Sequence, residues 1–146
     1  MPRVEGQRAP AASEGRKRVL VLTADAGFGH RAAANAVVQA IEERYDGHCE
    51  AVIANPLDDA RAPALLKKAQ EDYDRMIRQS PDLYRLGYQA SDGPLPTGIA
   101  EQALSLMLYA TLRDCLIKWE PDAIVSTYPL YQAPLATLCA LTRRCI

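Results

Sequence analysis

The sequence predicts an α/β fold in which helices cover both faces of a Rossmann-like parallel sheet. Short runs of apolar, partly β-branched residues alternate with longer segments whose apolar residues recur at helical spacing. Strands that alternate with helices in this way pair in parallel through right-handed crossovers. A glycine turn between the first strand and the first helix also lies where such sheets bind their ligands.

The first strand is predicted at residues 19–22, where four consecutive apolar residues suit a central strand buried on both faces. Gly27 and Gly29 follow it, allow the backbone to bend sharply and let a ligand approach closely. A helix is predicted from Arg31 onward, because apolar residues recur along one face from Ala34 to Tyr45. Its free N-terminal amides favour an anionic or oxygen-rich ligand.

The rest of the chain continues this alternation of strands and helices. The predicted elements are a strand at 49–54, a helix at 60–79, a helix at 99–119, a strand at 123–127 and a helix at 133–142. Asp58 or Asp59 is expected to cap the helix after the second strand. The 99–119 helix is apolar around much of its circumference, so we expect it to be covered on more than one side.

The carboxyl ends of parallel strands meet at one edge of a sheet, where ligands bind. The glycine turn follows the first strand, and Ser126-Thr127-Tyr128-Pro129 follows the third. These two segments are therefore expected to converge on one cleft.

Composition narrows the class of protein. The chain has 146 residues, of which 49% are hydrophobic, and this is enough for one domain with a real core. Its net charge of −1 gives no support for nucleic-acid binding. Residues 1–17 lack the apolar core of a secretory signal and are predicted to be a disordered lead-in to a domain at 18–146.

The cysteines and the lengths of the apolar runs predict the cellular compartment of the protein and whether it binds a metal. None of the runs approaches the roughly 18 apolar residues of a transmembrane helix. The four cysteines show no CxxC spacing and no histidine at metal-binding spacing. We therefore expect reduced thiols in a cytoplasmic protein and no metal site.

The glycine turn satisfies the G-x-G-x-x-A pattern of dinucleotide-binding proteins, with a strand before it and a helix after it. The acidic residue that this pattern requires is not evident, because the second strand runs into Asn55-Pro56. A P-loop and a G-x-S-x-G hydrolase turn are both absent from the sequence. A nicotinamide-binding module therefore stays open as an alternative.

Three segments together resemble one family. Residues 19–34 read VLVLTADAGFGHRAAA, residues 80–92 read SPDLYRLGYQASD, and residues 119–135 read WEPDAIVSTYPLYQAPL. They occur in the order seen in the monogalactosyldiacylglycerol synthase and processive diacylglycerol glucosyltransferase family. That family is related to the peptidoglycan lipid II glycosyltransferase. The resemblance covers residues 18–142, nearly the whole predicted domain.

The resemblance implies the N-terminal, acceptor-side half of a GT-B glycosyltransferase, incomplete and without its donor-binding domain. The implied reaction transfers a hexose from UDP-glucose or UDP-galactose to diacylglycerol. Its chemistry is inverting, needs no metal and no cofactor, and uses the UDP-sugar as a co-substrate. The implied location is peripheral, at the cytoplasmic face of the membrane. We expect the chain alone to be inactive, and a non-catalytic lipid-binding domain is the alternative.

The resemblance also implies roles for residues in the glycine turn. His30 is expected to be the general base, and the adjacent helix N-terminus disfavours its imidazolium form. Asp25 is expected either to oppose that effect or to orient the ring through a hydrogen bond. Gly27 and Gly29 are expected to let the backbone approach the donor diphosphate or the acceptor.

Apolar and aromatic residues in the middle of the chain are candidates for contact with the lipid acceptor. They are Tyr73, Met76, Tyr84 and Tyr88. The alternative is that this stripe packs on the sheet. The sequence departs from the family pattern at Phe28, in the glycine turn, and at Tyr128, where the family usually has histidine. No role of that histidine is carried over to Tyr128.

Overall fold

Three parallel strands form the centre of the protein in a computed structural model that describes residues 15–26, 28–64, 66–68, 70, 72 and 97–142. The strands are β1 (Lys17–Leu22), β2 (Cys49–Ala54) and β3 (Ala123–Ser126), in the order β2-β1-β3. Both neighbours pair with β1 in parallel, with Val21 opposite Ile53 on one side and Val125 on the other. The predicted parallel α/β sheet is confirmed.

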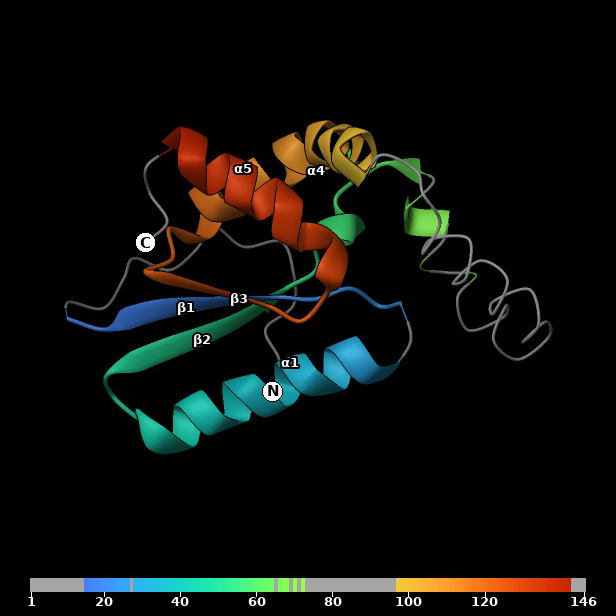
Figure 1. Ribbon diagram of the computed structural model, residues 1–146. Helices are drawn as coiled ribbons and strands as arrows, with labels where there is room; N and C mark the ends of the chain where they lie inside the picture. Colours follow the sequence, from blue (N-terminus) through green and yellow to red (C-terminus); the bar gives the residue numbers. More distant parts are fainter. Residues whose placement is uncertain are drawn as a thin grey trace.

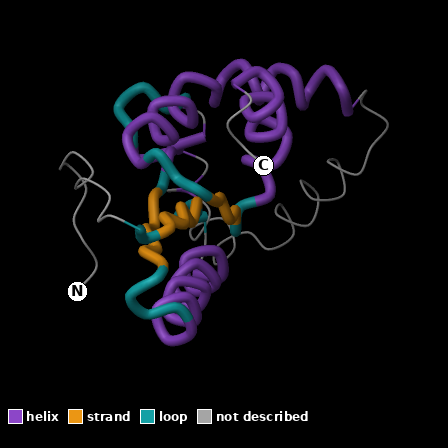
Figure 2. Tube along the Cα trace, turned by 90° about the vertical axis from the view of Figure 1, so that its left-hand side faces the viewer, coloured by secondary structure: helices purple, strands orange, loops and turns teal. Residues whose placement is uncertain are grey.

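Helices cover both faces of this sheet (Figure 1). Helix α1 (Phe28–Arg44) lies on one face, and α4 (Thr97–Trp119) and α5 (Gln132–Thr142) lie side by side on the other. Figure 2 shows the strands as a separate layer between them. Two short 3₁₀ helices, η1 (Pro56–Asp58) and η2 (Pro129–Tyr131), follow β2 and β3. Within the predicted 60–79 helix, residues 64, 66–68, 70 and 72 are helical.

The main core lies between the sheet and the α4–α5 layer. Side chains alternate between the two faces of a strand, so Leu20 and Leu22 face one layer and Val21 faces the other. The fully buried residues of the main core include Leu20, Leu22, Leu108, Leu112, Tyr131 and Leu138. On the α1 side, Val21 and the small residue Ala34 are buried.

One expectation about the helices is corrected, and part of α4 is exposed. Helix α1 begins at Phe28, so Gly29 and His30 belong to its first turn rather than to a turn before it. On α4, Leu106 is 80% exposed and Ile117 is 52% exposed. The side of α4 that carries these two residues faces solvent, while Leu108 and Leu112 are fully buried.

Local capping and cysteine chemistry also differ from expectation. Asn55 caps η1 by accepting a hydrogen bond from the amide of Leu57, while Asp59 accepts one from the amide of Arg61. Cys49 and Cys115 are free thiols, but Cys139 is disulfide-bonded. The expectation of reduced thiols is wrong at Cys139. No helix in the described residues is long and apolar enough to cross a membrane.

A buried arginine joins the start of β1 to the connection between α4 and β3. Arg18 is only 5% exposed, and its guanidinium donates to the carbonyl of Trp119 at 2.7 Å. The Arg18 amide donates to the Asp122 carboxylate, and the Asp122 amide donates to the Arg18 carbonyl, both at 2.8 Å. Lys17 adds an ion pair to Asp122 at 2.9 Å. This end of the sheet is therefore fixed by both backbone and side-chain bonds.

Asp122→Asn is expected to lower the free energy of unfolding at pH 7. The hydrogen bonds from Arg18 and Lys17 hold the pKa of Asp122 below its ordinary value of 3.8. The ionised carboxylate therefore stabilises the fold above that ordinary value, and this stabilisation is lost as pH falls through the lower folded pKa. Urea unfolding from pH 7 to pH 3 should show the deficit of the variant shrinking.

The matched control is Asp46→Asn, which changes an exposed carboxylate in the turn after α1. It should move the urea midpoint little at any pH. An Asp122→Asn deficit that stays constant down to pH 3 would contradict the assignment.

Candidate functional site

The ends of β1 and β3 and the start of α1 converge, as predicted. His30, in the first turn of α1, has its ring Nδ1 2.6 Å from the carbonyl oxygen of Thr127, which directly follows β3. The Thr127 hydroxyl donates to the carbonyl of His30 at 3.0 Å, and the Thr127 amide donates to the carbonyl of Leu22 at 2.9 Å. One residue, Thr127, thus contacts all three elements at the carboxyl edge of the sheet.

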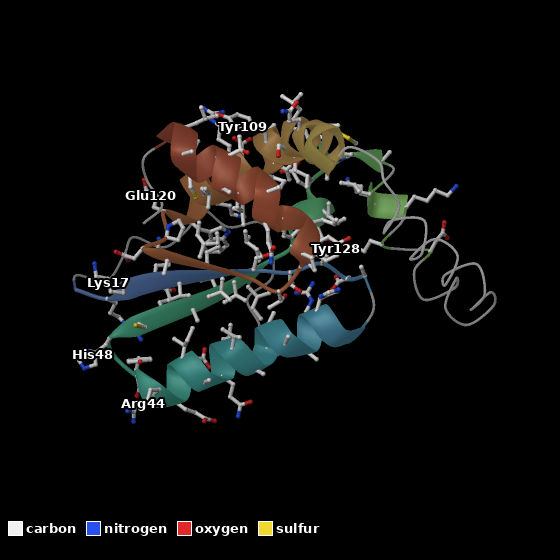
Figure 3. All side chains as sticks on the ribbon, in the orientation of Figure 1. Lys17, Arg44, His48, Tyr109, Glu120 and Tyr128 are labelled. Atoms are coloured by element: carbon white, nitrogen blue, oxygen red, sulfur yellow. The ribbon has the colours of Figure 1, made fainter. Side chains whose placement is uncertain are left out.

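Tyr128 supports the other side of the imidazole. Its ring meets that of His30 edge to face, with centroids 5.1 Å apart and planes at 80°. Tyr128 meets Tyr131 in the same way, at 5.0 Å and 72°. Figure 3 places Tyr128 at the end of β3, above the start of α1. Burial raises the pKa of Tyr128, so this half-buried phenol is protonated at neutral pH.

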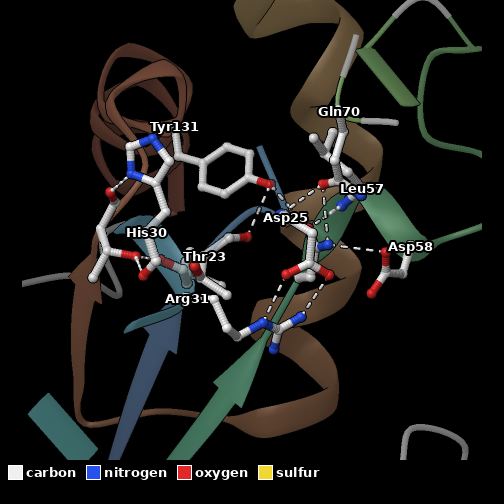
Figure 4. A network of polar contacts seen from close by, with 11 residues as sticks. Thr23, Asp25, His30, Arg31, Leu57, Asp58, Gln70 and Tyr131 are labelled. Carbon is white, nitrogen blue, oxygen red and sulfur yellow. Dashed lines mark hydrogen bonds and ion pairs between the residues drawn. The ribbon is translucent and has the colours of Figure 1, made fainter. Parts of the chain in front are cut away.

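Tyr131 is fully buried and anchors a polar network that runs along this edge (Figure 4). Its hydroxyl lies 3.2 Å from the carbonyl oxygen of Thr23 and 3.4 Å from Oδ1 of Asn55. The Asn55 amide group in turn donates to Asp58 at 2.9 Å and to Gln70 at 3.2 Å. Burial raises the pKa of Tyr131 strongly, so its hydroxyl remains a donor.

The network ends in an ion pair between Arg31 and Asp25. Arg31 donates to both carboxylate oxygens of Asp25, at 2.7 and 2.8 Å, and the amide of Asp25 donates to Gln70 at 2.9 Å. Arg31 holds the pKa of Asp25 below its ordinary value, so this carboxylate is ionised at neutral pH. Asp25 therefore orients Arg31 rather than His30. The group that bonds the imidazole is the Thr127 carbonyl.

Gly29 has open space around it. A Cβ atom built on Gly29 would meet no atom within 4 Å, so packing inside the chain does not demand glycine there. Gly27 and the side chain of Phe28 lie outside what the structure describes. The four candidates for lipid contact, Tyr73, Met76, Tyr84 and Tyr88, also lie outside the described residues.

The described part of this edge has no carboxylate, histidine and cysteine grouping of three or more that could hold a metal ion. What it does hold is a half-buried imidazole beside an ionised Asp25–Arg31 pair. A neutral imidazole in such a place can accept a proton from a hydroxyl group. Tyr131, Asn55 and Gln70 were not predicted, because no local pattern distinguishes them from ordinary core and loop residues.

This fold and this edge together define a Rossmann-like α/β protein with a histidine at the ligand-binding end of its sheet. Comparison with known proteins specifies the family. The family described as Monogalactosyldiacylglycerol (MGDG) synthase matches residues 30–144. The chain therefore belongs to this family.

Individual relatives agree with this assignment. A probable monogalactosyldiacylglycerol synthase of Nicotiana tabacum, described as chloroplastic, is 31% identical over 127 residues, which is 86% of this chain and 23% of that protein. The synthase of Spinacia oleracea is 30% identical over 126 residues, covering 86% of this chain and 24% of its own length. The chain thus spans about a quarter of the length of these curated relatives. No solved structure matches it.

Tyr131→Phe is expected to lower the free energy of unfolding by about 1 kcal/mol, because it removes the buried hydroxyl that bonds the Thr23 carbonyl and Asn55 Oδ1. Urea unfolding would measure this loss. We expect the dependence of the unfolding free energy on urea concentration to be unchanged. Tyr45→Phe, at a tyrosine that is 52% exposed, is the matched control and should be close to neutral. Equal effects of the two substitutions would argue against a buried Tyr131 hydroxyl bond.

Proposed function

We propose that this chain is the acceptor-side part of a glycosyltransferase that transfers a hexose from UDP-glucose or UDP-galactose to diacylglycerol. Family membership over residues 30–144 supports the class of reaction. The observation that carries the proposal for this chain is the position of His30. Its imidazole lies at the carboxyl edge of a parallel sheet, which is where such folds bind ligands, and it is half-buried there.

His30 acts as the general base in the proposed reaction. Its ring takes the proton of the diacylglycerol hydroxyl as the hydroxyl oxygen bonds to the anomeric carbon of the sugar. The bond between that carbon and the diphosphate breaks, and its electron pair leaves with UDP. Attack from the face opposite the leaving group inverts the anomeric centre. We propose that neither a metal nor a cofactor takes part.

In this proposal the donor is held by a second domain of the GT-B arrangement, separate from residues 18–146. The length supports this, because the chain spans only about a quarter of its relatives. The proposed protein works at a membrane surface, where its lipid acceptor resides, and the cytoplasmic location remains a prediction. A non-catalytic lipid-binding domain is the remaining alternative.

A nicotinamide-binding module is less well supported than a transferase. Such modules place an acidic side chain after the second strand to bind the ribose. Here β2 is followed by Asn55, whose side chain bonds Leu57, Asp58 and Gln70 within the chain. The side chain at that position is therefore already hydrogen-bonded within the chain.

The first test is glycolipid formation from each UDP-sugar on vesicles that contain diacylglycerol. The chain is assayed alone and with a separately made donor-binding domain of the family. We expect product only in the complemented reaction, with inverted anomeric configuration and undiminished by EDTA. His30→Ala should lower the rate at least about 100-fold, because it removes the base.

His48→Ala is the matched control, because it removes the only other histidine of the chain, an exposed one at the opposite end of the sheet (Figure 3). It should leave the rate unchanged. A full-length relative serves as the positive control for the assay. If that relative turns over and no arrangement of this chain does, the transferase proposal fails and a lipid-binding role remains.

Gly29→Ala separates a structural role for this glycine from a functional one. Alanine has the higher helix propensity and its Cβ has open space, so the free energy of unfolding should rise by about 0.5–1 kcal/mol. The transfer rate should fall, because the added methyl group occupies space that a bound substrate uses. Urea unfolding and the vesicle assay measure the two effects. A stabilised variant with full activity would show that no substrate approaches Gly29.

A further inference from the structure

We infer that Thr127 and Tyr128 are positioning residues that hold His30 in the tautomer protonated at Nδ1, with Nε2 left as the proton acceptor. The inference deepens the role of His30 and rests on the proposed function for its catalytic meaning. Its structural part is independent of that function. It concerns which ring nitrogen of this one imidazole carries the hydrogen.

The first argument is the chemistry of the contact at 2.6 Å between Nδ1 of His30 and the carbonyl oxygen of Thr127. A carbonyl oxygen can only accept a hydrogen bond, so Nδ1 must carry the hydrogen. In a neutral imidazole the other nitrogen is then unprotonated and can accept. An unconstrained neutral histidine instead favours the hydrogen on Nε2, so the protein must impose the opposite choice.

The second argument is that the Thr127 carbonyl is itself held in place. The Thr127 amide donates to the Leu22 carbonyl at 2.9 Å, which extends the β1–β3 pairing by one residue. The Thr127 hydroxyl lies 3.0 Å from the His30 carbonyl and 3.3 Å from the Leu22 carbonyl. Thr127 and His30 are therefore bonded to each other twice, because the Thr127 carbonyl accepts from the ring Nδ1 and the Thr127 hydroxyl donates to the His30 carbonyl.

The third argument concerns the ring plane. Tyr128 meets the imidazole edge to face at 80°, and Tyr128 is in turn backed by the fully buried Tyr131. Such aromatic contacts restrict rotation of the imidazole about its side-chain torsions. Without this support the ring would be freer to rotate about these torsions and to lose the bond from Nδ1 to the Thr127 carbonyl.

In the proposed reaction, the imidazole that acts as the base is hydrogen-bonded through Nδ1 to an uncharged group, the Thr127 carbonyl. The carboxylate of Asp25 is committed to Arg31 through two hydrogen bonds. When Nε2 takes a proton from the acceptor hydroxyl, Nδ1 keeps its hydrogen and its bond to Thr127. The ring orientation therefore does not need to change during the proton transfer.

The deciding experiment is ¹⁵N NMR of the chain at alkaline pH. Pyrrole-type and pyridine-type shifts of each ring nitrogen report the tautomer directly. We expect a pyrrole-type Nδ1 at His30. His48 is the internal control, because it is exposed and should show the ordinary mixture dominated by Nε2–H. A His30 that behaves like His48, or carries its hydrogen on Nε2, would overturn the inference.

Two substitutions at Tyr128 test the positioning role. Tyr128→Phe keeps the ring contact and should leave the tautomer unchanged. Tyr128→Ala removes the contact and should shift His30 toward a mixture, with the circular dichroism spectrum and a cooperative melt showing that the fold is intact. If Tyr128→Ala leaves the tautomer unchanged, Tyr128 is not a positioning residue.

Two substitutions at His30 test the bond itself. The side-chain nitrogen of asparagine can replace Nδ1 at the Thr127 carbonyl, whereas that of glutamine corresponds in position to Nε2. We expect His30→Gln to melt about 2–4 °C below His30→Asn, although helix propensity favours glutamine. Equal melting temperatures, or the reverse order, would overturn the proposed bond.

The outcomes separate this inference from the proposed function. A pyrrole-type Nδ1 in a chain that supports no glycosyl transfer would leave the positioning intact and remove the transferase proposal. If glycosyl transfer depends on His30 but the hydrogen is found on Nε2, the transferase proposal stands and the positioning inference is removed.

Discussion

The hydrogen bonds of Thr127 are the contacts on which the rest of the site depends. This residue directly follows β3, bonds the last residue of β1 and bonds the first turn of α1. Without these bonds, the His30 imidazole would keep its edge-to-face contact with the ring of Tyr128. A general base must lie within hydrogen-bond reach of the proton it takes, so a fixed ring matters more here than a particular loop shape.

The two ends of β1 are held by different chemistry. At the amino end, the buried Arg18 and the carboxylate of Asp122 make charge-assisted bonds that fix the connection into β3. At the carboxyl end, backbone carbonyls and side-chain hydroxyls make most of the bonds, and the Asp25–Arg31 ion pair lies at the same end. The charge-assisted bonds of Arg18 and Asp122 therefore fix the end of the sheet that is opposite to the candidate site.

Tyr131 connects the aromatic contacts of His30 to the polar network of Asn55, Gln70 and Asp25. Its ring supports Tyr128, and its hydroxyl is bonded to Thr23 and Asn55. A single buried side chain therefore links the segments that follow all three strands. This explains how a sheet of only three described strands can hold a defined edge, even though the chain spans about a quarter of its relatives.

The sequence by itself determined the strand positions, the parallel pairing and the family, because these follow from runs of apolar residues and from motifs local in the chain. Cys49–Ala54 was predicted to the residue, and the meeting of the glycine turn with residues 126–129 followed from parallel topology alone. Only the tertiary structure decided which side chains bond one another. Asp25 bonds Arg31 instead of His30, α1 begins before Gly29, and Leu106 is exposed. The carbonyl that bonds the imidazole belongs to Thr127, which is 97 residues from His30 in the chain, and no local spacing encodes such a contact.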